Sequence, residues 1–208
     1  MEFNVLPLFS FPLAVFTVEE NFFNLKSSLK EMNFEKSGSD LSHNFYHTDT
    51  GKLLENFPEE KNIIMKYFYQ YKDQVLGLET TDFQITTSWI TKTEDKGYSH
   101  SHCHTNCAFS GIFYFDSCEG GEIEFKNPFP STFEFESNNE SNIFNSNSFI
   151  FKPEKNKLII FPSCLYHKVH KNTSGKSRYS LAFNLFPTGI FGSADSSINL
   201  KVLELDNF

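Results

Sequence analysis

Apolar residues recur every three or four positions near the start of the chain, which is typical of an amphipathic helix. The segment runs from Val18 to Met32, and its apolar positions are Phe22, Leu25, Leu29 and Met32. The preceding Thr17-Val-Glu-Glu20 resembles a capping box, in which a hydroxyl and a carboxylate satisfy free backbone amides. The pattern predicts a helix over 18–32.

A second helical pattern follows a polar stretch, KSGSDLSHNFYHTDTGK, which predicts a loop with a short strand around Phe45. Pro58 is favoured at the first position of a helix, and Gly77 is a suitable residue to end one. Between them runs a stripe of apolar residues that we expect to be buried. The stripe consists of Ile64, Phe68, Tyr71 and Val75.

Beyond Gly77 the apolar period changes to two, which indicates strands. Asp82 to Thr93 is predicted to be the first strand, and AFSGIFYFD the next. Glu119-Gly120-Gly121 predicts a turn, with EIEF as the returning strand, and KLIIFP and RYSLAFNLF are further strands. Many short strands predict a mainly β fold with N-terminal helices, a sandwich or jelly roll, rather than βαβ units.

The length of 208 residues predicts one domain, 1–208. Within it we expect helical support over about 17–77 and a jelly-roll core over about 82–208. An Asn/Ser-rich insert at 126–148 interrupts the core. We expect a surface loop there, either a lid or an insertion without a role.

Charge and composition exclude several classes of protein. A formal net charge of -8 and a pI near 5.4 argue against unaided binding of duplex nucleic acid, which needs clustered Lys and Arg. The sequence has no apolar run long enough to predict a membrane span. Its apolar start lacks the basic region of a signal peptide, so we do not expect one. The four cysteines have no C-x-x-C spacing, so we expect free thiols in a cytoplasmic protein.

Three of the seven histidines alternate in YSHSHCHTN: His100, His102 and His104. In an extended strand residues two apart share one face, so these imidazoles would line one side. Non-haem Fe(II) oxygenases hold iron with two histidines and one carboxylate on one face of the ion, leaving positions vacant for substrate and oxygen. The pair here would be His102 and His104, with His167 or His170 of FPSCLYHKVHKN as the distant ligand.

The strand RYSLAFNL begins at Arg178 and alternates between a mostly polar face and a fully apolar face. The polar face consists of Arg178, Ser180, Ala182 and Asn184. A planar guanidinium donates two parallel hydrogen bonds and so suits a carboxylate-bearing cosubstrate. We expect Arg178 to bind that cosubstrate, with Ser180 and Asn184 beside it.

Several motifs, in this order, resemble those of a family of 2-oxoglutarate/Fe(II)-dependent oxygenases, a small group common in marine bacteria and their phages. The motifs are LPLFSFPLAVF, SWI, HCHTNCAFSGIFYF, GGEIEF, LIIFPSCLYHKVHKN and RYSLAFN. The resemblance implies a double-stranded β-helix, a cupin-like jelly roll. It also implies a hydroxylase that converts 2-oxoglutarate to succinate while oxidising an unidentified substrate with O2. The implied site residues are His102, His104 and His167 as catalytic Fe(II) ligands, and Arg178 and Tyr114 on 2-oxoglutarate.

One departure concerns His104, because the wider superfamily carries Asp or Glu at this position. An imidazole there leaves the iron centre more positive by one unit. Three interpretations stay open: a three-histidine iron site, an open position at His104, or a site for another metal. A zinc site that adds Cys103 and Cys107 has an unfamiliar ligand spacing.

Two functional alternatives also stay open. The first is a cupin-like three-histidine metalloenzyme that does not use 2-oxoglutarate, and the second is a non-catalytic jelly-roll binding module. We expect His100 to lie outside the first ligand set, His170 to be exposed and Trp89 to belong to the core. The sequence leaves the substrate undefined, and a homodimer is an open alternative to a monomer.

Overall fold

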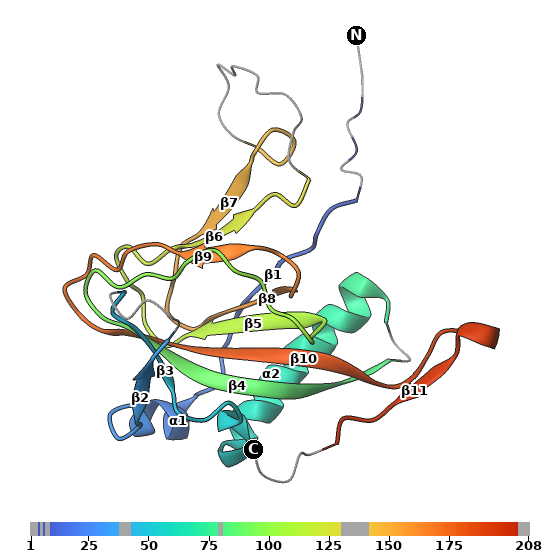
Figure 1. Cartoon of the computed structure of the whole chain (residues 1–208), viewed down its shortest axis with the longest axis horizontal. Coiled ribbons are helices and arrows are strands. Elements are labelled where there is room, and N and C mark those ends of the chain that lie inside the picture. Colours follow the sequence, from blue (N-terminus) through green and yellow to red (C-terminus); the bar gives the residue numbers. More distant parts are fainter. Residues whose placement is uncertain are drawn as a thin grey trace.

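Two antiparallel sheets form the body of the computed structural model, which describes residues 4, 6, 9–37, 43–78, 81–129 and 142–203. The large sheet contains, in spatial order, β1 (Ala14–Thr17), β8 (Lys157–Pro162), β5 (Phe109–Tyr114), β10 (Arg178–Phe191), β4 (Asp82–Thr93), β3 (Phe45–Thr48) and β2 (Phe34–Lys36), and β11 (Ile198–Leu200) pairs with β10. The small sheet contains β7 (Ser148–Phe151), β6 (Ile123–Lys126) and β9 (His167–Val169). Figure 1 shows the helices on one face of the large sheet and the small sheet on the other.

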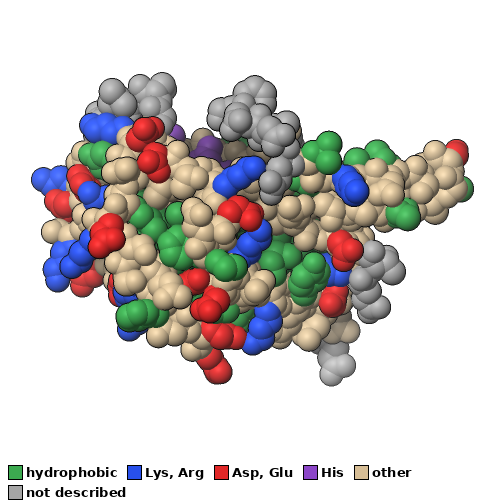
Figure 2. Space-filling model, turned by 90° about the horizontal axis from the view of Figure 1, so that it is seen from below, with side chains coloured by type: hydrophobic (Ala, Val, Ile, Leu, Met, Phe, Trp, Pro, Cys, Tyr) green, Lys and Arg blue, Asp and Glu red, His purple; other side chains and the backbone are tan. Residues whose placement is uncertain are grey.

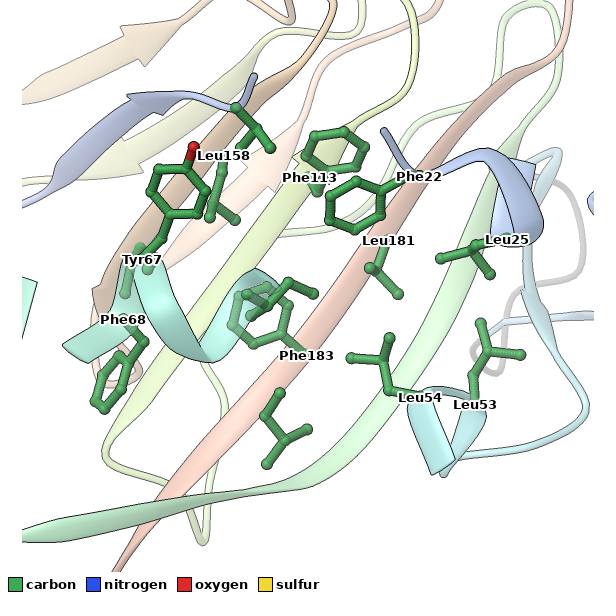
Figure 3. Close-up of a cluster of buried hydrophobic side chains, with 14 of the residues drawn as sticks. Phe22, Leu25, Leu53, Leu54, Tyr67, Phe68, Phe113, Leu158, Leu181 and Phe183 are labelled. Atoms are coloured by element: carbon green, nitrogen blue, oxygen red, sulfur yellow. The ribbon is translucent and has the colours of Figure 1, made fainter. Parts of the chain in front are cut away.

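The main core lies between the large sheet and the helices α1 (Phe23–Ser28) and α2 (Pro58–Tyr71). Leu181, Phe183 and Leu185 point to this side of β10 and are fully buried. Figure 3 shows part of this core, with the rings of Phe22 and Phe113 facing each other. These two rings are stacked, with their centroids 4.1 Å apart. The apolar face predicted for RYSLAFNL is therefore the core face.

A smaller core lies between the two sheets. Its buried residues are Tyr114, Ile123, Phe125, Ile159, Phe161 and Leu165. Along β8, Ile159 and Phe161 face this second core, while Leu158 and Ile160 face the helices. Because β8 is apolar on both faces, KLIIFP is a continuous apolar run rather than an alternating one.

The first predicted helix is wrong in its extent and its cap. Thr17 ends β1, and α1 begins only at Phe23, without a side-chain cap at Phe22. Glu20 is instead held by Tyr67, whose hydroxyl donates at 2.6 Å, and by Lys66. The amide of Leu25 in α1 donates to the buried Glu60 of α2. Tertiary partners thus take the place of the local capping box.

The second helix begins at Pro58 as predicted, but its last turn differs. A π-helical turn, Lys72–Leu76, follows α2 and ends at Gly77, whose φ is +65°. A wider turn rotates the later residues about the helix axis. Val75 is therefore exposed, contrary to the predicted stripe, and Lys72 is buried in contact with Asp73 and the Leu78 carbonyl.

EIEF forms β6 but does not return along β5, which corrects the predicted pairing. Both edges of β5 are already occupied, by β8 on one side and β10 on the other. β6 pairs instead with β7 and β9 in the small sheet. The chain crosses between sheets at Gly120 and Gly121, where φ is +69° and +65°.

Of the remaining elements, some have the bounds predicted from the sequence and others were not predicted. The strand predicted at Asp82 to Thr93 has those bounds in β4, and Phe45 begins β3. Two 3-10 turns, Leu53–Asn56 and Ala194–Ser196, complete the described elements. Of the insert at 126–148, residues 130–141 lie outside the described residues.

Two observations concern the chain as a whole. Among the described residues, no helix combines the length and the apolar character that crossing a membrane requires. Cys103, Cys107, Cys118 and Cys164 are all free.

Candidate metal centre and adjoining pocket

Three imidazoles meet at one end of the space between the sheets. One ring nitrogen from each of His102, His104 and His167 lies within 4.8 Å of the others. His167 begins β9, and His102 lies in the segment before β5. The two residues form an isolated antiparallel bridge, in which the His102 amide donates to the His167 carbonyl at 2.9 Å and the His167 amide to the His102 carbonyl at 2.8 Å. Ligand atoms bound at about 2.1 Å on one face of an ion lie about 3 Å apart, so the three rings must move closer together than their present spacing of up to 4.8 Å to share a metal.

The other ring nitrogen of each histidine is already used. The Nδ1 atoms of His102 and His167 lie 2.8 and 2.9 Å from the carbonyl oxygens of His100 and Leu165. A carbonyl only accepts, so each Nδ1 carries the proton and each Nε2 keeps a free lone pair. Both histidines are therefore held in the tautomer that binds a metal through Nε2.

His104 is held by side chains rather than by backbone. Its Nδ1 lies 2.6 Å from Asn184 Oδ1 and 2.9 Å from Ser110 Oγ. Ser110 also donates to Asn184 and contacts Ser163, and the Asn184 amide donates to Thr87 Oγ1. Ser110, Asn184 and Thr87 are direct neighbours across β5, β10 and β4, so the sheet register builds this polar row. Asn184 thus contacts His104 and is not among the residues that line the pocket.

Arg178 lies at the opposite end of the same pocket and is 5% exposed. Its Nη1 donates to the Gly121 carbonyl at 2.5 Å, and its Nη2 to Thr93 Oγ1 at 3.4 Å. Its Nε is buried without a hydrogen-bond partner among the described residues. No described carboxylate pairs with this guanidinium. Arg178 is therefore a buried cation with donor capacity left over.

A single cavity of about 320 Å³ joins the histidines to Arg178. It is lined by Ser37, His43, Phe45, His47, Trp89, Thr91, Tyr98, Ser99, His100, His102, His104, Ile112, Tyr114, His167, Val169, Arg178, Ser180 and Ala182. Among the described residues of this lining, Arg178 is the only Arg, Lys, Asp or Glu. Histidine side chains are visible in a hollow near the upper edge of Figure 2.

Burial shifts the pKa values of several groups in this pocket. It lowers the pKa of His167 to about 3 and that of His47 to about 4, with smaller contributions from neighbouring histidines. Burial also lowers the pKa of His104, against the hydrogen bond that its Nδ1 donates to Asn184 Oδ1. The fully buried Tyr114 has a pKa raised to about 12 by burial, against the nearby Arg178. These imidazoles are neutral at pH 7, which is the form that binds metals.

The other histidines predicted from the sequence lie apart from the three. The ring of His100 contacts His43 and Tyr98, although its carbonyl orients His102. His170 pairs with Glu124 at 2.7 Å on the surface of the small sheet. The metal cluster found among the described residues contains no cysteine.

Trp89 differs from its predicted place in the core, because it is only partly buried and lines the pocket. His43, His47 and Gly121 were missed by sequence reasoning. His43 and His47 reach the pocket through β3 and the residues preceding it, a placement with no local sequence signal. A Cβ at Gly121 would lie 2.9 Å from Arg178 Nη1, so this glycine allows the guanidinium to reach its position.

A known protein family matches the part of the chain that contains most of this site. Residues 87–184 match the family model described as "Putative 2OG-Fe(II) oxygenase". This segment contains the three histidines and Arg178, so the resemblance seen in the motifs is confirmed. A comparison with curated proteins found no match.

Solved structures share the fold at low sequence identity. HygX from Streptomyces hygroscopicus, with nickel and 2-oxoglutarate bound, has a TM-score of 0.57 at 10% identity over 85% of this chain and 83% of its own. A prolyl-4-hydroxylase from Pseudomonas putida has a TM-score of 0.57 at 11% identity over 85% and 93%. The α-ketoglutarate-dependent epimerase SnoN from nogalamycin biosynthesis has a TM-score of 0.60 at 9% identity over 84% and 78%. These matches confirm the predicted double-stranded β-helix.

Proposed function

We infer that this chain is a 2OG-Fe(II) oxygenase, an oxidoreductase that holds Fe(II) with His102, His104 and His167 and binds 2-oxoglutarate with Arg178. The observation that carries this inference is a buried guanidinium without a described carboxylate partner, in the same pocket as three converging imidazoles. A buried charge is costly unless it is paired, so the pocket favours an anionic ligand at Arg178. The family match over residues 87–184 supports the same assignment.

The donor set fits a divalent transition metal. Imidazole nitrogen suits iron, nickel and zinc, and three ligands on one side leave other coordination positions vacant. The carbonyls of His100 and Leu165 and the side chain of Asn184 hold the three rings in the tautomer that binds metal. HygX, which shares this fold, was solved with nickel and 2-oxoglutarate bound.

The opposite end of the pocket fits the far carboxylate of 2-oxoglutarate. Arg178 supplies its unpartnered Nε and the donors that Gly121 and Thr93 leave free. Ser180 is buried on the same face of β10 and offers a hydroxyl, and the ring of Tyr114 lies 5.7 Å from the guanidinium. We therefore propose Arg178 as the anchor, with Ser180 and Tyr114 completing the carboxylate site. For Asn184 we propose a different task, positioning His104.

When bound, Fe(II) and 2-oxoglutarate supply the oxidising chemistry, in which O2 converts 2-oxoglutarate to succinate and CO2 and a substrate C–H bond is oxidised. The chain's own residues orient both cofactors and exclude water with apolar side chains such as Ile112, Val169 and Ala182. We propose hydroxylation as the outcome, the reaction for which the similar P. putida enzyme is named. An epimerase shares the fold, so the substrate's placement decides between these outcomes.

Anaerobic titration of the Fe(II) protein with 2-oxoglutarate tests the proposal, because chelation of iron by 2-oxoglutarate produces a metal-to-ligand absorption band. Wild type should show a saturable band, and His167→Ala should show none. Arg178→Ala should keep iron but bind 2-oxoglutarate at least about tenfold more weakly, since a buried charge pair is broken. Arg178→Lys, the conservative control, should recover part of the affinity. A wild-type protein that binds iron and gives no band would contradict the proposal.

One alternative is favoured by a specific observation, the absence of a carboxylate from the three-residue cluster. A cupin-like three-histidine enzyme that does not use 2-oxoglutarate would bind Fe(II) in the same titration without the band. A non-catalytic module would bind no iron at all. If His104 leaves its position open, His104→Ala should retain most of the iron affinity, whereas a three-histidine site should lose it.

A further inference from the structure

The pocket has an aromatic end that the proposed function leaves without a ligand. This aromatic end consists of His43, Phe45, His47, Trp89, Tyr98 and His100. Phe45 lies level with Arg178, because both residues pair with Thr93 of β4. His100 is joined to the metal centre by the backbone, since its carbonyl accepts the hydrogen bond from His102 Nδ1. A molecule held there would lie beside the metal ligands.

The rings of the aromatic end form two adjoining walls. In the first, the ring centroids of Phe45 and His47 are 5.3 Å apart, those of His47 and Trp89 are 5.6 Å apart, and those of Trp89 and His104 are 5.9 Å apart. This wall therefore runs without interruption to a proposed metal ligand. Flat π faces stack most favourably on a flat partner, with offset or edge-on contacts.

Rings also form the second wall. His43 is 4.3 Å from Tyr98 and 4.2 Å from His100 between centroids, both edge-on at about 70°. His43 is buried, whereas His100 is exposed, so this wall runs from the interior to the pocket rim. Imidazole edges carry hydrogen-bonding nitrogens, which allow polar contacts in the plane of a ligand.

The charges in the pocket select against an ionised ligand at the aromatic end. Among the described residues that line the pocket, none is Asp, Glu or Lys, and Arg178 is assigned to 2-oxoglutarate. Lys171, whose Nζ lies 5.9 Å from the Tyr98 ring, is not part of this lining. A charged group on the ligand would lose its hydration on entering the pocket and meet no opposite charge there, which is unfavourable. A neutral ligand meets no such penalty.

Trp89 adds a requirement for a hydrogen-bond acceptor. It lines the pocket, and its indole N–H is buried without a partner among the described residues. A buried donor without an acceptor is costly, and native proteins rarely keep one. The indole nitrogen has almost no accessible surface, so a ligand with a carbonyl oxygen or ring nitrogen would satisfy it after a rotation of the indole that opens the N–H to the pocket.

We propose that the aromatic end binds the oxidised substrate and that this substrate presents an uncharged, planar heteroaromatic group with a hydrogen-bond acceptor. The assignment of this group as substrate rests on the proposed function. The binding site itself rests on the ring geometry, the uncharged lining and the unpartnered Trp89 N–H.

Trp89 is the only tryptophan of the chain, so ¹⁵N-labelled protein has one indole N–H resonance, which reports directly on the aromatic end. Zn(II) replaces Fe(II), because it is diamagnetic and does not turn over, and 2-oxoglutarate is kept saturating. The probe is nicotinamide, which is flat, neutral and bears acceptors. Its matched controls are cyclohexanecarboxamide, which is not flat, nicotinate, which is anionic, and 1-methylnicotinamide, which is cationic.

Nicotinamide should shift the indole resonance saturably, and each control should bind at least about tenfold more weakly, because each loses stacking or adds an unpaired charge. Phe45→Ala and His47→Ala should weaken nicotinamide binding by a similar factor, since each removes a ring of the first wall. Phe149→Ala, at an exposed position on β7, should leave it unchanged. Equal or tighter binding of any control, or no saturable shift with nicotinamide, would overturn the inference.

The Fe(II) titration with 2-oxoglutarate separates this outcome from failure of the proposed function. If the absorption band forms but nicotinamide does not bind, only the substrate assignment fails. If the band does not form, the nicotinamide titration repeated without Zn(II) and 2-oxoglutarate still tests the aromatic end. Saturable binding under those conditions would uphold the site while the oxygenase assignment falls.

Discussion

At the scale of single residues, the proposed metal centre depends on where the second nitrogen of each imidazole points. Backbone carbonyls hold His102 and His167, whereas His104 depends on the side chains of Asn184 and Ser110. A carboxylate at position 104 would need no choice of tautomer, but an imidazole does. A site with histidine at position 104 therefore needs the polar row of Ser110, Asn184 and Thr87, which a site with a carboxylate there would not need.

Replacing Asn184 tests this dependence. Asn184→Leu removes the acceptor for His104 Nδ1, and loss of such a partner typically weakens metal binding by about 10- to 100-fold. Asn184→Asp keeps an acceptor and should bind metal within a few-fold of wild type. Competition with a chelator for Ni(II) measures both affinities. Equal affinities for the Leu variant and wild type would remove Asn184 from the site.

His47 makes stability depend on pH on the acid side. Its pKa is lowered from 6.5 to about 4, mainly by burial, so below pH 6.5 the unfolded chain binds a proton that the folded chain does not. The free energy of unfolding should therefore fall as pH drops from about 6.5 to about 4, with no contribution from His47 above that window. His167 contributes in the same direction, down to about pH 3.

Thermal unfolding of the metal-free protein at pH 7 and pH 5 checks this prediction. Wild type should lose more thermal stability between these pH values than His47→Gln, because the glutamine does not titrate. The difference between the two should be a few degrees in Tm, the range expected for a single group. Parallel losses in the two proteins would show that His47 is not held neutral by the fold.

The sequence predicted the placement of those site residues whose neighbours along the chain carry a clear pattern. The two-residue spacing places the rings of His102 and His104 nearly parallel, 5.4 Å apart at 19°, although no named strand contains them. The alternation that begins at Arg178 separates a pocket face from a core face. Asn184 was expected beside the cosubstrate, whereas the structure places it against His104, a contact that follows from neighbouring strands and not from its own alternation.

At the scale of elements, β10 lies between the main core and the pocket, because its side chains point alternately to one and to the other. Close packing beside it is visible at Gly111 of β5, where a Cβ would lie 2.1 Å from the ring of Phe183. Gly111 pairs with Phe183 across the strands, so neither backbone can move away without breaking the sheet. This strand position therefore requires glycine because of space.

Gly111→Ala should destabilise the protein by about 1–3 kcal/mol, the usual cost of overpacking a core. The control is Gly51→Ala, because no atom lies within 4 Å of the added Cβ at that bend. Chemical denaturation of the two variants measures the free energies of unfolding. A Gly111→Ala protein as stable as the control would contradict the packing described here.

Strands were predicted better than helix ends because their signal is a face pattern that the fold preserves. β4 has the predicted bounds, and its Phe83, Ile85 and Ile90 belong to the main core, although a bulge near Thr86 changes which alternate residues face that core. The capping box failed because β1 takes Thr17 and the tertiary partners Lys66 and Tyr67 take Glu20. The buried position of Lys72 follows from a π-helical turn, which apolar periodicity at 3.6 residues does not detect.

At the scale of the whole molecule, the site exists because two sheets converge at one end. The bridge between His102 and His167 joins the segment before β5 to the small sheet, and Arg178 reaches the same cavity from the large sheet. The many short strands predicted a sandwich or jelly roll, and the family resemblance implied the jelly roll. Sequence reasoning did not predict that β5 and β6 would separate, because pairing between distant strands has no local signal.

The measurement that tests the central claim most directly is the number of metal ions that each chain binds. Anaerobic calorimetric titration with Fe(II) should give one ion per chain for wild type. His102→Ala and His167→Ala should lose that binding, because each removes a ring nitrogen from the cluster. His100→Ala and His170→Ala should retain it, since their rings lie outside the cluster. Undiminished binding of one Fe(II) per chain by both His102→Ala and His167→Ala would contradict the assignment of the metal centre.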